Sequence, residues 1–307
     1  MQKNTSMILI CDCGSTKAEW ALLDVRNVAK RFITNGFNPN FTDNETITKI
    51  IGETKELVGN QDVRKIFFYG SGCGSETNQN KVAMILDMVF KINDIEVYPD
   101  TLAACHALFG NNPGIACILG TGSNACFYDG EKITQSIVSL GFMIGDEGSG
   151  CHIGKHIVHD YFLGLMPEEL RLKFDEKYHL DRDSFLKRVY QGEQPSRYLA
   201  EFAKFASENI DNQYIKDVVS LCFEEFINSS FRPTVGSGEI SFKHGSYSIA
   251  GDFSIPLRSS RNDKIAFVGS IAFTFQNILL KTLENHNVKC SKILKNPMDG
   301  LIDFYKN

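Results

Sequence analysis

The sequence predicts an α/β protein with two domains, each built around its own sheet. Its 307 residues exceed the usual length of one domain, and 43% of them are hydrophobic, which is enough material for two cores. Short apolar runs alternate with segments of helical spacing, an order typical of α/β proteins. A unit of strand, Gly/Ser/Thr turn and strand opens the chain and occurs again after Gly114, so both halves are expected to start with the same hairpin.

The first half is expected to alternate strands with helices. Strands are predicted over residues 7–11, 18–24, 28–33, 65–69 and 95–98, and helices over 46–58, 80–90 and 101–109. Asp43 stands where the first helix needs an N-cap. A turn cluster at 111–114 ends this half, so we place the domains at 1–113 and 114–296.

The second half restarts the pattern and then becomes mostly helical. Strands are predicted over 115–119, 125–128, 132–134, 265–268 and 288–293, and helices over about 147–225, 270–283 and 298–304. Residues 233–260, rich in Gly and Ser, favour an inserted β-hairpin or mobile loop. The C-terminal helix, about 297–307, could pack back onto the first domain.

Composition and charge exclude several classes of function. The net charge is −5 and no basic stripe is present, so nucleic acid is not an expected partner. No apolar run approaches the roughly 20 residues that cross a bilayer, and the N-terminus lacks the pattern of a signal peptide. Nine scattered cysteines indicate reduced, buried thiols. We therefore expect a cytoplasmic protein without a membrane partner. The sequence is compatible with a homodimer as well as with a monomer.

The first hairpin turn has the composition of a phosphate site. Gly14, Ser15, Thr16 and Lys17 offer backbone N–H groups, hydroxyls and one cation between two predicted strands. Asp12, at the strand end, could hold Mg²⁺ through water. An ordinary Gly-Ser hairpin with an exposed lysine would explain the same residues.

The second hairpin turn repeats this arrangement. Gly120, Thr121 and Gly122 follow a predicted strand and precede another, with Asn124 inside the latter. Two matched turns, one in each domain, could hold a nucleotide from both sides, and the pair is more specific than either member. Gly269 lies at a strand-to-helix junction, where the missing side chain would admit an adenine or ribose.

Two acidic positions are candidates for substrate chemistry. Asp100 follows the strand at 95–98 and precedes a helix, so it could act as a general base or as a helix N-cap. Asp146 lies in a Gly-rich acidic turn, where the pattern predicts a helix N-cap; its carboxylate could also bind sugar hydroxyls. His152, His156 and His159 share a helical face, which we interpret as solvated and not as a metal site.

The sequence resembles the BadF/BadG/BcrA/BcrD-type ATPase family, and within it the N-acetylglucosamine kinase branch. The resemblance rests on the order and spacing of four motifs: Asp12–Lys17, Gly120–Asn124, Gly145–Ser149 and Val268–Ser270. The resemblance covers residues 8–304 apart from 233–260. It implies two actin-like (ribonuclease H-like) domains with mixed sheets and an interdomain cleft that closes on the sugar. Where animal members have Trp and His before the acidic turn, residues 140–144 are apolar here. An amino sugar is therefore a firmer expectation than N-acetylglucosamine.

The resemblance also implies roles for individual residues. The activity would be ATP-dependent phosphorylation of N-acetylglucosamine to its 6-phosphate, with Mg·ATP as donor and Asp100 as base. The cofactor residues would be Gly14, Ser15, Thr16, Lys17, Gly120, Thr121, Gly122 and Gly269. The sugar residues would be Asp100, Asn124, Asp146 and either Asn38 or Asn40.

Two other functions stay open at this point. Some members of the family activate 2-hydroxyacyl-CoA dehydratases through an Fe–S cluster, but the Cys-Ala-Ala-Gly-Thr-Gly type of motif is missing before Gly122, where Cys117 is followed by Ile118 and Leu119. A sugar or nucleotide sensor without turnover is the second alternative. Asp100 favours an enzyme over a sensor, because a binding module has no need of a base.

Overall fold

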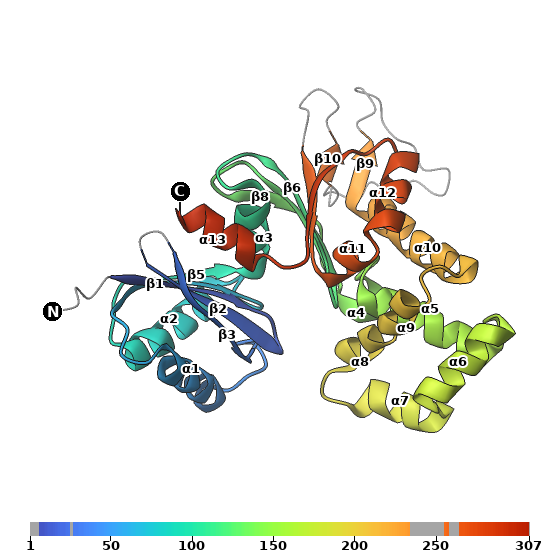
Figure 1. Ribbon diagram of the computed structural model, residues 1–307, viewed down its shortest axis with the longest axis horizontal. Helices are drawn as coiled ribbons and strands as arrows, with labels where there is room; N and C mark the ends of the chain where they lie inside the picture. The colour runs from blue at the N-terminus through green and yellow to red at the C-terminus, as the bar shows by residue number, and fades with distance from the viewer. Residues whose placement is uncertain (1–5, 25–26, 234–254, 258–263, 307) are drawn as a thin grey trace, which may run out of the picture. The chain divides into compact units, whose positions relative to one another are not determined.

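The structure, a computed structural model, describes residues 6–24, 27–233, 255–257 and 264–306. The chain divides into two compact units (Figure 1). Unit 1 comprises Met1–Asn112 and Asn296–Asn307, and unit 2 comprises Pro113–Lys295. Each unit contains a five-stranded mixed sheet with helices. The predicted two-domain α/β class is confirmed.

The sheet of unit 1 has the order β3-β2-β1-β4-β5. Its strands are β1 (Met7–Cys13), β2 (Lys17–Leu23), β3 (Val28–Asn35), β4 (Val63–Gly70) and β5 (Ile95–Pro99). The first three form an antiparallel meander, whereas β1, β4 and β5 run parallel. The carboxyl ends of these three parallel strands therefore meet at one edge of the sheet.

Helices cover both faces of this sheet (Figure 1). They are α1 (Asn44–Val58) and α2 (Glu76–Phe90) on one face and α3 (Asp100–Phe109) and α13 (Met298–Lys306) on the other. Asp43 caps α1 as predicted, because its carboxylate accepts the Thr46 N–H at 2.8 Å. The Ser75 hydroxyl caps α2 in the same way.

Unit 1 has an apolar core on one face of the sheet and a polar network on the other. Trp20, Phe37 and Phe68 are fully buried between the sheet and the helices α1 and α2. On the opposite face the Tyr69 hydroxyl contacts Nδ1 of His106 on α3 at 2.7 Å and the Tyr305 hydroxyl on α13 at 2.5 Å. This network ties the C-terminal helix to the strand and helix that lead to the sheet edge.

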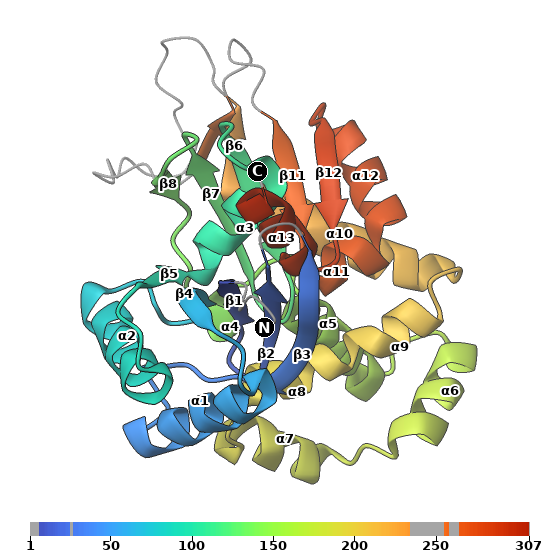
Figure 2. The ribbon, with the colours of Figure 1, turned by 60° about the vertical axis from the view of Figure 1, so that its left-hand side comes forward.

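The sheet of unit 2 has the order β12-β11-β6-β7-β8, and Figure 2 shows these strands side by side. They are β6 (Gly114–Leu119), β7 (Ser123–Tyr128), β8 (Ile133–Ser136), β11 (Ile265–Val268) and β12 (Cys290–Leu294). The hairpin predicted at Asp129-Gly130 is present, since β7 pairs with β8 antiparallel. As in unit 1, an antiparallel meander adjoins parallel strands.

The helices of unit 2, apart from the short helix Gly141–Ile144, form one large apolar core against its sheet. The helices of this unit are α4 (Gly141–Ile144), α5 (Gly150–Leu163), α6 (Glu168–Tyr178), α7 (Arg182–Gln191), α8 (Pro195–Glu201), α9 (Ala203–Glu208), α10 (Gln213–Ser230), α11 (Ser270–Thr274) and α12 (Gln276–Asn285). Fully buried aromatic rings, among them Phe223, Phe226 and Phe267, fill the core. It holds α5 and α10 in contact with each other.

Two elements differ from the sequence prediction, and one predicted segment is mostly not described. The helix expected over 270–283 is broken at Phe275 into α11 and α12. The segment 233–260 lies mostly outside the described residues, and only its flanks are seen as a short parallel pair, β9 (Phe231–Pro233) and β10 (Ile255–Leu257). The short helix α4 stands in the apolar stretch before the acidic turn. None of the described helices is both long and apolar enough to span a bilayer.

Candidate active site

The proposed site residues of unit 1 gather at the carboxyl edge of its parallel strands. In the register of the sheet, Cys13 of β1 pairs with Gly70 of β4, and Gly70 pairs with Pro99 of β5. Asp12 therefore lies at the end of β1, and Asp100 directly follows β5. This is the sheet edge at which α/β proteins bind ligands.

The first hairpin turn is closed by its own backbone and supported by a neighbouring glycine. The Gly14 N–H donates to the Lys17 carbonyl at 2.9 Å. Gly36 lies so close behind the turn that a Cβ there would come within 2.0 Å of the Gly14 carbonyl oxygen. Gly14 and Ser15 are exposed and Thr16 is half-buried, so the turn itself stays accessible.

Asp12 lies among other acidic groups. Burial raises its pKa to about 7, and the charges of Asp100 and Glu19 add to that rise. Glu19 is its cross-strand neighbour on β2 and is paired with Arg31 at 2.6 Å. Carboxylates that repel one another are stabilised by a divalent cation, so this set of donors suits Mg²⁺.

Asp100 is the first residue of α3, and the N-cap position belongs to Pro99. The interpretation of Asp100 as N-cap is therefore wrong by one residue. Burial raises the pKa of Asp100, although hydrogen bonds from the Thr101 backbone and the Ser71 side chain partly oppose the rise. A carboxylate with a raised pKa accepts a proton more readily near neutral pH, as a general base requires.

A hollow of about 380 Å³ opens beside Asp100. Its lining is rich in amide, hydroxyl and glycine groups: Asn40, Gly72, Gly74, Ser75, Asn78, Pro99, Asp100 and Thr101. Asn40 is exposed and lines this hollow, whereas Asn38 does not. The side-chain oxygen Oδ1 of Asn38 accepts the Asn40 N–H at 3.0 Å and lies against Gly72, so Asn38 shapes the loop.

Asn78 is a member of this site that the sequence did not reveal. Its Nδ2 donates to Oδ1 of Asn40 at 2.7 Å and to the Gly72 carbonyl at 2.8 Å. Because the Asn40 oxygen is occupied in this way, the amide group of Asn40 is held in one orientation. The contact joins residues far apart in sequence, and no local motif signals it.

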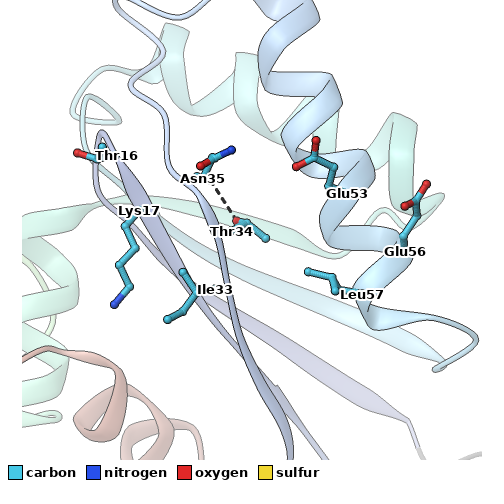
Figure 3. Close-up of a pocket in the computed structure, with 8 residues that line it drawn as sticks. All are labelled: Thr16, Lys17, Ile33, Thr34, Asn35, Glu53, Glu56 and Leu57. Carbon is cyan, nitrogen blue, oxygen red and sulfur yellow. Dashed lines mark hydrogen bonds between the residues drawn. The ribbon is translucent and has the colours of Figure 1, made fainter.

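A larger hollow of about 680 Å³ lies between the meander and α1 (Figure 3). Thr16 and Lys17 reach it, but its α1 wall carries the carboxylates Glu53 and Glu56. Two acids disfavour a phosphate there. Lys17 extends away from both glutamates and lies 4.0 Å from Glu19. The larger hollow is therefore a poor candidate for a phosphate site.

In unit 2 the second hairpin turn is surrounded by backbone. The α5 N-terminus contacts it through two hydrogen bonds, from the Gly150 N–H to the Gly120 carbonyl at 2.8 Å and from the Cys151 N–H to the Thr121 carbonyl at 3.1 Å. Gly269 has a φ of 129° and lies against the Leu119 carbonyl, which a Cβ would approach to 2.2 Å. The structure thus brings Gly269 and the second turn together.

Asp146 joins the second turn, but its role as a helix N-cap is a wrong prediction. The helix α5 begins at Gly150, and Ser149 caps it by accepting the His152 N–H at 3.1 Å. Asp146 adopts a positive φ of 60°, and its carboxylate accepts the Ser123 N–H at 3.3 Å. Burial raises its pKa. Asn124 follows on β7, where its own Oδ1 accepts the Ala125 N–H at 2.8 Å.

The comparisons with solved structures cover almost the whole chain. The structure of a putative N-acetylglucosamine kinase from Porphyromonas gingivalis is 32% identical, with a TM-score of 0.85, and the match covers 98% of this chain and 99% of that one. A putative N-acetylglucosamine kinase from Chromobacterium violaceum matches at 12% identity and a TM-score of 0.68, over 98% of this chain and 99% of that one.

A more distant likeness shows the fold alone. A ROK family glucokinase from Streptomyces griseus, solved with glucose and AMPPNP, matches at 11% identity and a TM-score of 0.54. The match covers 97% of this chain and 98% of that one.

No protein of the curated set matches this chain significantly. The model of the BadF/BadG/BcrA/BcrD ATPase family matches residues 11–209, about two thirds of the sequence. The chain therefore belongs to the BadF/BadG/BcrA/BcrD ATPase family.

Proposed function

We propose that the protein is an ATP-dependent sugar kinase that converts N-acetylglucosamine to N-acetylglucosamine 6-phosphate. The observation that carries the proposal is Asp100, a carboxylate of raised pKa in a polar hollow at the same sheet edge as the first hairpin turn. The relationship to the Porphyromonas protein supports it, because that likeness extends over the whole chain at 32% identity.

In this proposal the two hairpin turns hold the phosphates of ATP. Gly14, Ser15, Thr16 and Lys17 would act from unit 1, and Gly120, Thr121 and Gly122 from unit 2. Phosphoryl transfer depends on positioning and charge stabilisation, which backbone N–H groups and Mg²⁺ supply. Asp12 would hold Mg²⁺ through water. Gly269, already against the second turn, would face the adenosine.

Asp100 would take the proton of the attacking sugar hydroxyl. Asn40 would bind the sugar from unit 1, with Asn38 holding its loop in shape, and Asn124 and Asp146 would bind it from unit 2. The helix α4 precedes Asp146 with the exposed apolar side chains Met143 and Ile144. Apolar surface of this kind suits the methyl group of an N-acetyl substituent better than a charged amine.

The two alternative functions receive no comparable support. An Fe–S activator needs thiolates that converge at an accessible place. The structure describes all nine cysteines, and eight of them are buried, with only Cys290 partly accessible. A sensor without turnover would not require a carboxylate of raised pKa such as Asp100 in its ligand hollow. We propose the cytoplasm as the compartment because none of the nine cysteines forms a disulfide.

A sugar panel tests the proposed function. ATP consumption is measured with N-acetylglucosamine, N-acetylmannosamine, glucosamine and glucose, and the phosphorylated position of the product is assigned by ³¹P and ¹H NMR. We expect the highest kcat/KM with N-acetylglucosamine and a 6-phosphate product. A rate that stays at the level without sugar for every compound would contradict the proposal. Turnover of glucose alone would overturn the assignment of the substrate.

Asn78→Ala tests whether the pair of amides forms the sugar side of the site. Without Asn78 the Asn40 amide loses its fixed orientation, so we expect KM for the sugar to rise about tenfold and KM for ATP to stay unchanged. Asn80→Ala, an exposed asparagine on the same helix, is the matched control. If Asn78→Ala binds sugar as wild type does while its thermal stability falls, Asn78 has only a structural role.

A further inference from the structure

Side chains from α5 and α10 form a second cluster of potential ligands below the acidic turn. The imidazoles of His152 and His156 and the thiol of Cys222 place their ligand atoms within 4.8 Å of one another. Glu225, one turn after Cys222 on α10, contacts Nε2 of His152. The expectation of a solvated histidine face is wrong for His152, which is buried, and holds only for His159, which is exposed and paired with Asp160.

Two of the distances between these ligand atoms match the edges of a tetrahedral metal site. Nε2 of His152 lies 3.3 Å from Nε2 of His156 and 3.2 Å from Oε2 of Glu225. A tetrahedral Zn²⁺ ion with bonds of about 2.0–2.1 Å requires edges of about 3.3–3.4 Å between such ligands. Two histidines at i and i+4 on α5, with a thiol and a carboxylate at i and i+3 on α10, therefore offer four ligand atoms to one ion.

The surroundings of the cluster are compatible with an ion. Cys222 is fully buried, whereas the Glu225 side chain is 44% exposed and leaves an entry path. The nearby ammonium group of Lys155 is held by the Phe142 carbonyl at 2.8 Å. The donors are two imidazoles, one thiol and one carboxylate, a set that favours Zn²⁺ and related transition metals over Mg²⁺ or Ca²⁺.

We propose that His152, His156, Cys222 and Glu225 form a binding site for one divalent transition metal ion, most suited to Zn²⁺. The site shares no residue with the Mg²⁺ position proposed at Asp12 and does not depend on the proposed kinase activity. Binding releases the thiol proton of Cys222, since the thiolate is the ligand.

The hydrogen bonds of His152 connect this site to the acidic turn. The Gly148 N–H donates to Nδ1 of His152 at 3.1 Å, so the ring proton of neutral His152 lies on Nε2. A metal on Nε2 needs the tautomer with the proton on Nδ1. The ion therefore replaces the hydrogen bond that Gly148 makes, two residues from Asp146, and the Gly148 amide reports on metal binding.

The test uses the full-length protein without a histidine tag, freed of metal with a chelator. Zn²⁺ is titrated in competition with a chromophoric chelator, Co²⁺ binding is followed by its thiolate-to-metal charge-transfer absorption, and the Gly148 amide is followed by NMR. We expect one Zn²⁺ per chain, the thiolate band with Co²⁺, and a shifted Gly148 resonance.

Variants identify the ligands. His156→Gln is expected to weaken Zn²⁺ binding at least about tenfold, and Cys222→Ser to remove the charge-transfer band. His159→Gln and Cys290→Ser, which alter a histidine of the same helix and the most accessible cysteine, should bind as wild type does. Because Cys222 is buried, near-native circular dichroism of each variant is required. Stoichiometric binding that survives His156→Gln, or no binding by the folded wild type, would overturn the proposal.

Discussion

Asp100→Asn is expected to lower kcat for sugar phosphorylation at least about a hundredfold while ATP affinity stays close to that of wild type. The amide can still accept the hydrogen bonds from Ser71 and Thr101, so the start of α3 should keep its geometry. It cannot accept the proton of an attacking hydroxyl. The measurement is steady-state kinetics at saturating sugar, together with calorimetric titration of ATP.

A matched control separates this effect from a general loss of charge. Asp87→Asn removes an exposed carboxylate from α2 and should leave kcat unchanged. Near-normal turnover by folded Asp100→Asn would remove Asp100 from the mechanism. A fall in ATP affinity as large as the fall in kcat would instead indicate that Asp100 acts on the nucleotide or its metal ion, as its electrostatic coupling to Asp12 would allow.

Local sequence signals predicted the elements well, because each depends on neighbouring residues. The apolar periodicity of α1 and its cap at Asp43, and the Asp129-Gly130 turn, are set within a few positions of the chain. The start of α5 was harder, since Asp146 and Ser149 are both acceptable N-caps. A positive φ and a hydrogen bond from Ser123 hold Asp146 at the second turn, and Ser149 is left to cap the helix.

Candidate site residues could be predicted where they belong to one continuous motif. They could not be predicted where the site brings together residues from several segments. The two glycine turns were found because their residues are adjacent in sequence. Asn78, on α2, was missed because its partner Asn40 lies on a loop far away in sequence, and only the folded structure shows that Asn40 and not Asn38 lines the hollow beside Asp100. The cluster around Cys222 was missed for the same reason. Only the packing of α10 on α5 brings its thiol to the histidines.

Gly122→Val is expected to weaken ATP binding about a hundredfold, the effect of losing one or two hydrogen bonds to a charged phosphate. The structure adds a consequence that the sequence does not show. A Cβ at Gly122 would lie 3.0–3.1 Å from the carboxylate atoms of Asp146, so the substitution should displace Asp146 and weaken sugar binding as well. Sequence reasoning alone predicts that sugar binding is untouched.

Gly120→Val distinguishes the two causes within the same turn. A Cβ at Gly120 meets no described atom within 4 Å, so this variant should keep the fold and the position of Asp146. If the turn holds phosphate, the added side chain occupies the space of the ligand, and ATP affinity should fall while sugar affinity stays unchanged. Calorimetric titration of each ligand alone measures both. Wild-type ATP affinity in both folded variants would reject the phosphate assignment. It would mean that a side chain added at either glycine leaves nucleotide binding unchanged, so the turn does not bind the phosphates.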